Sequence, residues 1–335
     1  MSVRMIIDTD GGVDDAAALW WALTAADVDL VGITVVHGNV PVEVAAGNVC
    51  RVLEAAGRPD IPVAVGFDEP FGPAPDLRPA DFIHGADGLG NTNRPAASFG
   101  PGDASASELL DRVAVDDVVL VTLGPLSNIA AHLAADASWA GRIARLVVMG
   151  GTVLGAGNAM PYGEANIAHD PAAAARVAQA GWRTPPLLVG LDVTHQATFT
   201  RSEFALLNER RTPAAEFLDE PLALYRQFGG TFCALDECPC HDLLAVMAAA
   251  RPGLVSGPVL PLAVQAERGP AWGSTIVDRR VPFFARGGDG SAQALPDGFS
   301  PWEIALEVDV LAFRSGVRAL FGGERGSDGG SGDPR

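Results

Sequence analysis

The chain has 335 residues, of which 48% are hydrophobic, enough to bury the core of one large domain. Its formal net charge of -18 at pH 7 opposes binding to a phosphate backbone or an anionic membrane, so no nucleic acid and no membrane is expected as a partner. The N-terminus lacks the pattern of a secretory signal and no apolar run is long enough to span a bilayer, which predicts a cytoplasmic protein. Its four cysteines are too few for a disulfide scaffold, and we expect them to be reduced.

Short extended runs alternate with longer helical runs along much of the chain. In order, they are Val3 to Ile7, Asp14 to Ala25, Leu30 to Val36, Val42 to Ala56, Val118 to Thr122, Leu126 to Ala135, Leu146 to Met149, Ala172 to Ala180 and Leu187 to Leu191. This alternation is typical of parallel strands joined by helices and predicts an α/β fold with a doubly wound, mostly parallel, Rossmann-like sheet. In such sheets ligands bind beyond the carboxyl ends of the strands, where candidate site residues are therefore sought.

The remaining segments are predicted from composition and pattern. Pro70 to Gly102 is rich in Pro, Gly, Asp and Asn and is predicted to be a flap over the site. The segment Phe204 to Leu244 has a helical pattern and is predicted to form a second lobe, and Thr275 to Val281 and Ile304 to Phe313 are predicted to be late strands. We expect residues 1–321 to form a single domain and residues 322–335 to form a disordered tail.

Four aspartates stand within eight residues around the end of the first predicted strand: Asp8, Asp10, Asp14 and Asp15. Crowded carboxylates raise one another's pKa and destabilise a fold unless a cation lies among them. Because the cluster provides only oxygen ligands, it favours calcium or magnesium over zinc. Helix capping explains only Asp14 and Asp15. An EF-hand loop is excluded, because a strand precedes the cluster and Leu19 stands where the last glutamate ligand belongs.

The run DTDGGVDDAAAL, Asp8 to Leu19, resembles the DTDPGxDDxxAL signature of the inosine-uridine preferring nucleoside hydrolase family. The resemblance continues in HGN at His37 to Asn39, HGADGLG at His84 to Gly90, LGPLSNIA at Leu123 to Ala130, VMGG at Val148 to Gly151, GNAMPYGEANIAHDPAAA at Gly157 to Ala174, LDVTH at Leu191 to His195, and HD at His241 and Asp242. Three positions depart from the family pattern. Gly11 replaces a proline, which we expect to make the acidic loop more flexible, Ala165 replaces a phenylalanine, and Leu243 replaces a proline.

The resemblance implies a metal centre and a catalytic pair. Asp10, Asp15, Asp242 and the backbone carbonyl of Leu123 are implied ligands of calcium, and Asp10 is the implied general base that activates water. His241 is similar to the residue that protonates the leaving base in family members accepting inosine and uridine. Taken alone, Asp242 would be interpreted as a helix cap and His241 as a structural histidine.

The resemblance also implies a ribose pocket and an activity. The implied substrate-binding residues are Asp14, Asn39, His84, Met149, Asn158, Glu164 and Asn166. The expected reaction is calcium-dependent hydrolysis of the N-glycosidic bond of ribonucleosides, in nucleoside salvage, by a homodimer or homotetramer. A single Asn in a loop more often bonds its own backbone, and this is the alternative interpretation of Asn158 and Asn166. Tyr225, Gln227 and Cys233 fall in a segment expected to contact the base, without assigned roles, so base preference is left open.

Two other functions compete with this interpretation. The residues Asp8 to Gly11 match the DxDG nucleophile motif of haloacid dehalogenase-type phosphatases, but those enzymes need a later lysine and this chain contains no lysine. A catalytically silent nucleoside-binding protein would keep the ribose and calcium ligands while losing the base or the acid. Because Asp10 and His241 are both present, the enzyme is the preferred hypothesis.

Overall fold

The structure, a computed structural model, describes residues 2–73, 76–77, 80–114, 117–209, 212–232, 237–280 and 295–322. Within these residues, a nine-stranded sheet of order β11-β10-β12-β6-β5-β4-β1-β2-β3 forms the centre of the fold. Its strands are β1 (Val3–Thr9), β2 (Val28–Val35), β3 (Val63–Val65), β4 (Val118–Thr122), β5 (Arg145–Met149), β6 (Leu187–Val189), β10 (Val259–Val264), β11 (Thr275–Val277) and β12 (Ser300–Ile304).

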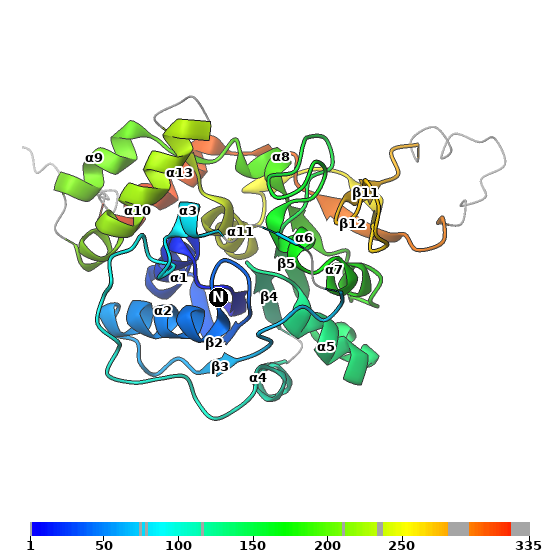
Figure 1. Cartoon of the computed structure of the whole chain (residues 1–335), viewed down its shortest axis with the longest axis horizontal. Helices are drawn as coiled ribbons and strands as arrows, with labels where there is room; N and C mark the ends of the chain where they lie inside the picture. The colour runs from blue at the N-terminus through cyan, green and yellow to red at the C-terminus, as the bar shows by residue number, and fades with distance from the viewer. Residues whose placement is uncertain are drawn as a thin grey trace, which may run out of the picture.

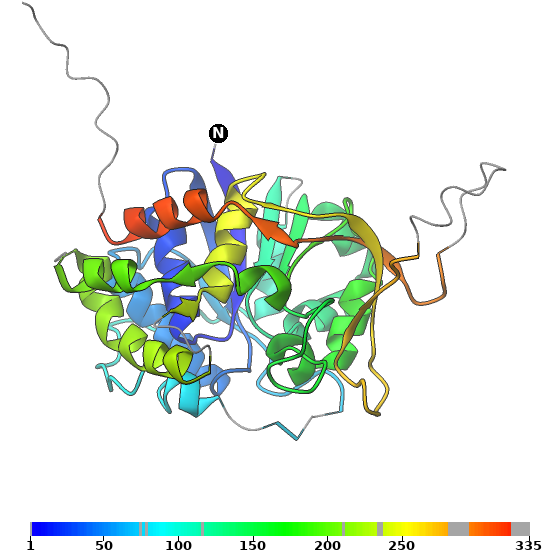
Figure 2. The same ribbon diagram turned by 90° about the horizontal axis from the view of Figure 1, so that it is seen from above.

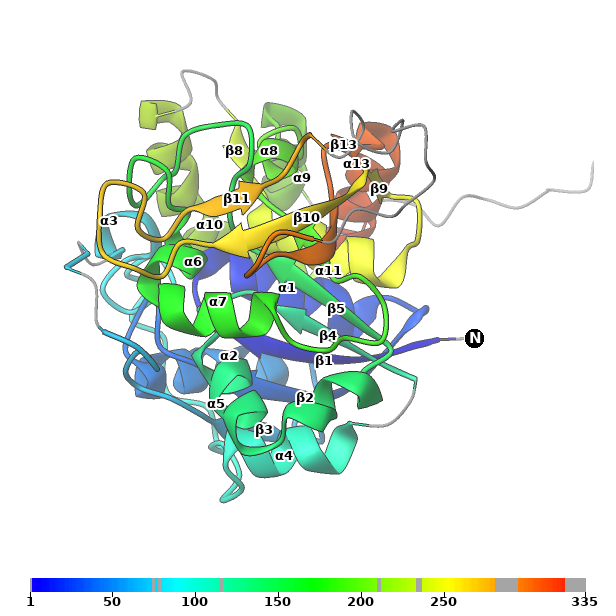
Figure 3. The same ribbon diagram turned by 90° about the vertical axis from the view of Figure 1, so that its right-hand side faces the viewer.

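The sheet is mostly parallel. Strands β1 to β6 run parallel to their neighbours and β12 runs parallel to β6. Strands β10 and β11 extend this edge in antiparallel fashion, and Figure 3 shows them above α7 (Pro171–Ala178), which contacts β10. The predicted doubly wound α/β fold is therefore confirmed.

Helices cover both faces of the sheet, because alternate strand residues enter two separate cores. In β1, Met5 and Ile7 pack into one core, whereas Ile6 packs into the other. The first core includes α1 (Val13–Thr24), α2 (Val42–Ala55) and α11 (His241–Ala250), and the second includes α4 (Ala106–Val113), α5 (Ser127–Ala135), the 3-10 helix η1 (Ala137–Arg142) and α7. Figure 1 shows α5 and α7 on one side of β4 and β5, with α1 and α11 on the other.

A further group of helices packs beside α1 and α11. It consists of α9 (Arg201–Glu209), α10 (Pro213–Phe232) and α13 (Val310–Leu320). Figure 2 shows α13 lying across α1 and α11. The prediction that Phe204 to Leu244 is helical is confirmed for most of its length, although β8 (Cys238–Pro239), paired with β7 (Thr198–Phe199), interrupts it. Residues 210–211 and 233–236 of this segment, Cys233 among them, lie outside the described residues.

The described part of the predicted flap, Pro70 to Gly102, is irregular apart from α3 (Asp81–His84), which packs against α10. A buried amide connects the flap to the acidic loop. The Nδ2 group of Asn48, on α2, donates to the Asp87 carbonyl and to the Gly11 carbonyl, both at 2.9 Å. The flap is thus held next to the loop that follows β1.

The prediction of a strand over Ile304 to Phe313 holds only for Ile304, the last residue of β12, and for Glu307–Val308, and it is wrong from Val310 on, where a helix forms. After β12, only the two residues of β13 (Glu307–Val308) are extended, and they pair with β9 (Val255–Ser256). The chain then turns into α13, where the Asp309 side chain accepts a hydrogen bond from the backbone N–H of Ala312 at 3.0 Å. This aspartate caps the helix, and the apolar spacing that follows buries one helical face. The predicted strand Thr275 to Val281 is confirmed for Thr275–Val277, which form β11, and is wrong for residues 278–280, which lie outside the strand. Val281 and the tail residues 323–335 lie outside the described residues.

The order β3-β2-β1-β4-β5-β6 places the point at which the chain changes direction between β1 and β4. Ligands of doubly wound sheets bind in the crevice beyond the carboxyl ends of the strands at such a point. The acidic loop follows β1 and Leu123 follows β4, so both lie there. Among the described residues, none of the helices has the length and apolarity required to cross a lipid bilayer.

Candidate functional site

The acidic loop is a tight connection between β1 and α1. Gly11 lies at φ +68°, and a Cβ atom at this position would stand 2.6 Å from the Cα of Ala45. The turn places Asp15 in the first helical turn, where its carboxylate accepts hydrogen bonds from the Thr9 hydroxyl and, at 2.9 Å, from the Gly12 N–H. Gly11 is thus favoured by a left-handed backbone and a close packing contact, whereas the expectation of a more flexible loop stays a prediction.

We expect the substitution Gly11→Pro to lower the free energy of unfolding by about 3 kcal/mol and to reduce activity. Proline fixes φ near -65°, so it cannot adopt the backbone angle of Gly11, and its ring would collide with Ala45. Gly57 provides a matched control, because it also has a positive φ of 69°, but a Cβ atom there would meet no other atom within 4 Å. Chemical denaturation should show a larger loss for Gly11→Ala than for Gly57→Ala. Equal losses would contradict the packing argument.

Asp10 is held by the loop that follows β2. The backbone N–H of Asn39 donates to Oδ2 of Asp10 and the Asn39 Nδ2 group donates to Oδ1, both at 2.9 Å. Gly38 lets the backbone approach, since a Cβ there would stand 2.1 Å from Oδ2 of Asp10. The HGN motif therefore orients the proposed base.

Asp8 does not join this group. Its Oδ1 atom accepts hydrogen bonds from the Thr34 hydroxyl at 2.5 Å and from Nδ2 of Asn128 at 2.7 Å. Burial is the main cause that raises the pKa of Asp8 to about 7. Of the four clustered aspartates, Asp8 is therefore the one whose side chain bonds Thr34 on β2 and Asn128 on α5.

Asp14, Asp15 and Asp242 converge, with one carboxylate oxygen from each lying within 4.8 Å of the others. All three are at most 5% exposed, and the buried Oδ1 atom of Asp14 has no hydrogen-bond partner among the residues that the structure describes. Burial, then the neighbouring carboxylates, raise the pKa of Asp14 to about 7 and the pKa values of Asp10 and Asp242 well above their usual range. Crowded, buried oxygen donors with an unsatisfied atom fit a hard metal ion, which would offset their repulsion.

This grouping differs in part from the predicted metal ligands. Asp14, predicted to bind ribose, lies with Asp15 and Asp242, whereas both oxygens of Asp10 are bonded to Asn39. The carbonyl of Leu123 accepts a hydrogen bond from Nδ2 of Asn166 at 2.7 Å. The structure thus brings the predicted acidic ligands to one end of the sheet, with Leu123 linked to the predicted ribose residues.

Three of the predicted ribose residues, Met149, Glu164 and Asn166, lie together at the end of β5. Nδ2 of Asn166, in α6 (Ala165–His169), also donates to the Met149 carbonyl at 3.1 Å. Glu164 is buried and caps α6, and its Oε2 atom accepts from the Gly151 N–H at 2.9 Å. Asn158 is exposed, and its Oδ1 atom accepts from the Ala165 N–H at 2.9 Å, which matches the alternative of a loop residue bonding its own backbone.

Two histidines and a tyrosine border the carboxylates. Nδ1 of His84 accepts from the Val13 N–H at 3.1 Å and lies 3.8 Å from Oδ1 of Asp14, and burial lowers the pKa of His84 to about 4. The Tyr225 hydroxyl donates to Oδ2 of Asp14 at 3.2 Å, a contact that sequence reasoning missed because only tertiary packing brings α10 to the acidic loop. Burial, then the neighbouring His195 and His84, lower the pKa of His241 to about 3, and Nδ1 of its ring lies 2.8 Å from the Thr194 hydroxyl.

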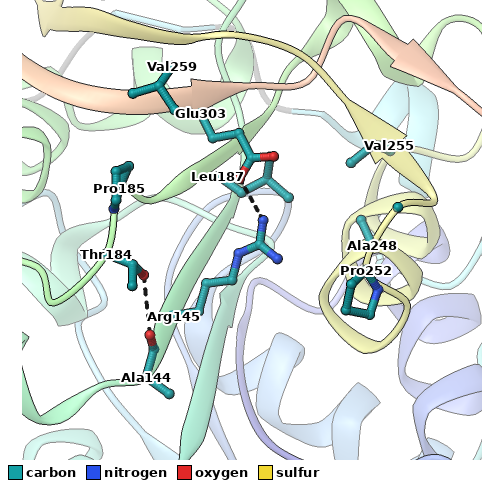
Figure 4. Close-up of a pocket in the computed structure, with 11 residues that line it drawn as sticks. Ala144, Arg145, Thr184, Pro185, Leu187, Ala248, Pro252, Val255, Val259 and Glu303 are labelled. Carbon is teal, nitrogen blue, oxygen red and sulfur yellow. Dashed lines mark hydrogen bonds and ion pairs between the residues drawn. The ribbon is translucent and has the colours of Figure 1, made fainter.

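A separate cavity of about 500 Å³ lies near the amino ends of β5 and β6, at the end of these strands opposite to the carboxylates (Figure 4). Its polar side chains already have partners. Nη2 of Arg145 is 2.8 Å from Oε2 of Glu303, and the Thr184 hydroxyl donates to the Ala144 carbonyl at 3.3 Å. This cavity therefore contributes nothing to the chemistry of the carboxylates.

The fold and the site together define a class, an α/β protein with a buried all-oxygen centre, suited to a metal ion, at the switch point of its sheet. The model of the family described as "Inosine-uridine preferring nucleoside hydrolase" matches residues 5–315. The chain belongs to this family and is a nucleoside hydrolase. Membership separates it from the haloacid dehalogenase-type phosphatases that share its DxDG motif.

Individual relatives agree with this assignment over most of their length. The chain is 35% identical over 312 residues to "Probable uridine nucleosidase 2" of Oryza sativa subsp. japonica, covering 92% of this chain and 89% of that protein. It is 35% identical over 285 residues to "Pyrimidine-specific ribonucleoside hydrolase RihA" of Klebsiella pneumoniae (strain 342), covering 83% and 89%. The solved structure "Plant nucleoside hydrolase - PpNRh1 enzyme" matches with a TM-score of 0.87 at 30% identity, covering 96% and 99%.

Proposed function

We propose that the chain is a calcium-dependent ribonucleoside hydrolase that cuts the bond between ribose and the nucleobase. The observation that carries this proposal is the convergence of Asp14, Asp15 and Asp242, buried and partly unsatisfied, beside Asp10. Asp10, Asp15, Asp242 and the Leu123 carbonyl would hold the ion. When bound, calcium would supply positive charge that keeps these carboxylates ionised and polarises oxygen atoms in contact with it.

Different residues of the chain have different proposed roles in the reaction. Asp10, oriented by Asn39, accepts the proton of the water whose oxygen bonds to the anomeric carbon, while the base departs with the electrons of the glycosidic bond. The surrounding carboxylates stabilise the positive charge that develops on the ribose. His241 is the proposed acid on the leaving-group side, and it gives a proton to the base as the glycosidic bond breaks.

Asp14, Glu164 and Asn166 are the proposed partners of the ribose hydroxyls, with Asn39, His84, Met149 and Asn158 completing the pocket. The unpaired Oδ1 atom of Asp14 supports this role, because a buried acceptor without a donor is ready to bind a hydroxyl. The same atom is also within reach of a cation, so the two roles of Asp14 require a direct test.

We expect ribonucleosides to be strongly preferred over 2'-deoxyribonucleosides. A substrate without the 2'-hydroxyl leaves a buried polar partner unpaired, at a cost of about 1–3 kcal/mol for each group. Reducing-sugar release should therefore give a kcat/KM for uridine about 10- to 100-fold above that for deoxyuridine. Comparable values would contradict the assignment of the ribose pocket.

The function itself is tested by reducing-sugar release from uridine and inosine in the presence of calcium. Uridine is the first choice, because two relatives are named for uridine or pyrimidine ribonucleosides. Release from neither nucleoside, with hydrolysis of nucleotide phosphate instead, would favour the phosphatase alternative. Tight nucleoside binding without release would favour the silent binding protein.

Three further expectations belong to this proposal. We propose that residues 1–321 form a single domain, that the protein assembles as a homodimer or homotetramer, and that it acts in nucleoside salvage in the cytoplasm. Light scattering of the purified chain tests the assembly. A monomeric mass at micromolar concentration would contradict it.

A further inference from the structure

Three buried polar side chains that the proposed mechanism does not use, those of His37, Ser127 and Asp170, are joined by hydrogen bonds. Nε2 of His37 lies 2.9 Å from the Ser127 hydroxyl, and this hydroxyl donates to Oδ2 of Asp170 at 2.7 Å. Ser127 and Asp170 are 0% exposed, and His37 is 7% exposed. Ser127 is the first residue of α5, Asp170 precedes α7, and His37 begins the HGN loop, residues 37–39, after β2. The hydrogen bonds therefore connect three segments that are far apart in the sequence.

The direction of these hydrogen bonds excludes a nucleophilic role for Ser127. Its hydroxyl hydrogen goes to the carboxylate of Asp170, which leaves the hydroxyl oxygen to accept from Nε2–H of His37. In a Ser-His-Asp hydrolase the histidine stands between the serine and the carboxylate and takes the serine proton. Here the serine stands in the middle, so the histidine does not accept its proton. The three side chains are thus suited to holding segments in place rather than to covalent catalysis.

The Asp170 end of this arrangement is firmly supported. Asp170 caps α7, because its Oδ1 atom accepts a hydrogen bond from the Ala173 N–H at 3.0 Å. The same carboxylate accepts from the backbone N–H groups of Phe71 and Gly72, at the beginning of the flap. Gly72 permits this approach, since a Cβ atom there would stand 2.3 Å from the Cβ of Ala172. One buried carboxylate therefore joins α5, α7 and the first residues of the flap.

The His37 end belongs to the loop that orients the proposed base. The backbone N–H of His37 donates to the Phe67 carbonyl at 2.9 Å and its side chain donates to Ser127, so the first residue of the HGN loop is held from two sides. Asn39, two residues further on, makes both hydrogen bonds to the carboxylate of Asp10. A shift of His37 would move Asn39 relative to Asp10 and leave the base misoriented.

We propose that Ser127 and Asp170 are positioning residues, which act through His37 to fix the loop that orients the base. Asp170 in addition fixes the beginning of the flap. The inference rests on the proposed function, because it takes Asp10 as the base. Ser127 should then affect kcat alone. Asp170 should affect both kcat and KM, because the flap carries His84, a proposed ribose contact.

The first test is Ser127→Ala in the full chain with calcium. This variant removes the hydroxyl between His37 and Asp170 but keeps the bonds of Asp170 to α7 and to the flap. We expect kcat for uridine to fall about 10-fold and KM to stay within about twofold, because the base is misoriented while the ribose pocket is kept. Initial rates of reducing-sugar release measure both constants. An unchanged kcat would overturn the inference.

The second test is Asp170→Asn, which keeps one oxygen to cap α7 but loses the second acceptor. It should lower kcat for uridine by a similar factor of about 10 and also raise KM by about threefold or more, because the flap is released as well. A variant that lowered kcat without raising KM would overturn the assignment of the flap to Asp170.

Ser107→Ala is the matched control for a loss of stability. The hydroxyl of Ser107, on α4, lies 2.6 Å from Nδ1 of His132, which is on α5 like Ser127. The control therefore breaks a serine–histidine hydrogen bond to the same helix, away from the acidic loop. It should leave kcat and KM for uridine within about twofold of the wild type, even if denaturation shows a lower stability. Equal losses of kcat in Ser107→Ala and Ser127→Ala would overturn the positioning role.

Variants of His37 give a further test that keeps Ser127, and they remain decisive if Ser127→Ala does not fold. Glutamine can place an amide N–H close to the position of Nε2, so His37→Gln should keep kcat within about threefold of the wild type. His37→Leu has no donor and should lose about as much kcat as Ser127→Ala. In a Ser127→Ala background His37→Leu should add less than about a twofold loss, since both changes remove the same hydrogen bond. Equal losses for His37→Gln and His37→Leu would contradict the inference.

The wild type separates failure of the inference from failure of the proposed function. A wild type that releases no sugar from uridine or inosine would overturn the proposed function, and the inference with it. An active wild type whose kcat is matched by Ser127→Ala and by His37→Leu would overturn the inference alone and leave Asp10 as the proposed base.

Discussion

Replacing Asp10 with asparagine is expected to lower kcat for uridine by about 10²- to 10⁴-fold, the range associated with loss of a positioned general base. The substitution keeps the size of the side chain and an oxygen that Asn39 can bond, but it removes the group that takes the proton from water. Initial-rate kinetics with reducing-sugar detection measures the effect. The loss should appear mainly in kcat.

Asp8→Asn is the matched control for this variant. Asp8 is buried and only two residues away, yet its carboxylate bonds Thr34 and Asn128. An asparagine oxygen can accept both of these hydrogen bonds, so this variant should retain kcat within about tenfold. Loss of the same size in both variants would mean that the acidic loop was disturbed as a whole, and Asp10 would lose its assignment as the base.

Removal of calcium is expected to abolish hydrolysis, with a loss of about 10²-fold or more that added calcium restores. Without a cation the carboxylates of Asp14, Asp15 and Asp242 repel one another in a buried space. Bound calcium should also stabilise the fold by about 2.7 kcal/mol at a concentration 100 times its dissociation constant. Full activity after exhaustive chelation, with no change in thermal unfolding, would contradict the proposed metal centre.

Two conservative variants decide which acidic residues hold the ion. Asp15→Asn should weaken calcium binding in calorimetric titrations. Asp14→Asn should leave calcium binding near that of the wild type and instead raise KM for uridine, because its oxygens are assigned to ribose and Tyr225. If both variants weaken calcium binding equally, Asp14 belongs to the metal ligands, as its proximity to Asp15 and Asp242 also permits.

The metal-free protein should lose stability as pH rises. Burial, then the charge of Asp15, raise the pKa of Asp14 to about 7 in the folded state, above its ordinary value near 4 when unfolded. The folded state therefore binds more protons between these values, and its stability falls as pH rises from about 4 through about 7. Calcium should add more stability at pH 8 than at pH 5, which thermal unfolding with and without the ion measures.

The location of the acidic site could be predicted from sequence because it depends on local order. A buried strand, Val3–Thr9, is followed by two glycines and a helix, so the aspartates between them must stand at the carboxyl end of that strand. The alternation of strand and helix patterns also predicted the parallel sheet, since strands and helices each bury residues at a recognisable spacing. By contrast, the first residues of α13, Val310–Leu320, were predicted to be a strand. The helix begins there because the side chain of Asp309 caps it, and the position of a helix boundary is poorly predicted from sequence.

Sequence by itself determined the oxygen chemistry of the site, the order of its motifs and the family to which the chain belongs. Only the tertiary structure decided which groups touch. It brought Tyr225 to Asp14 and Thr194 to His241, pairs separated by 211 and 47 positions, and it separated Asp8 from the other aspartates. The physical reason is that hydrogen bonds between distant segments depend on how helices pack on the sheet, and no local pattern of residues encodes that packing.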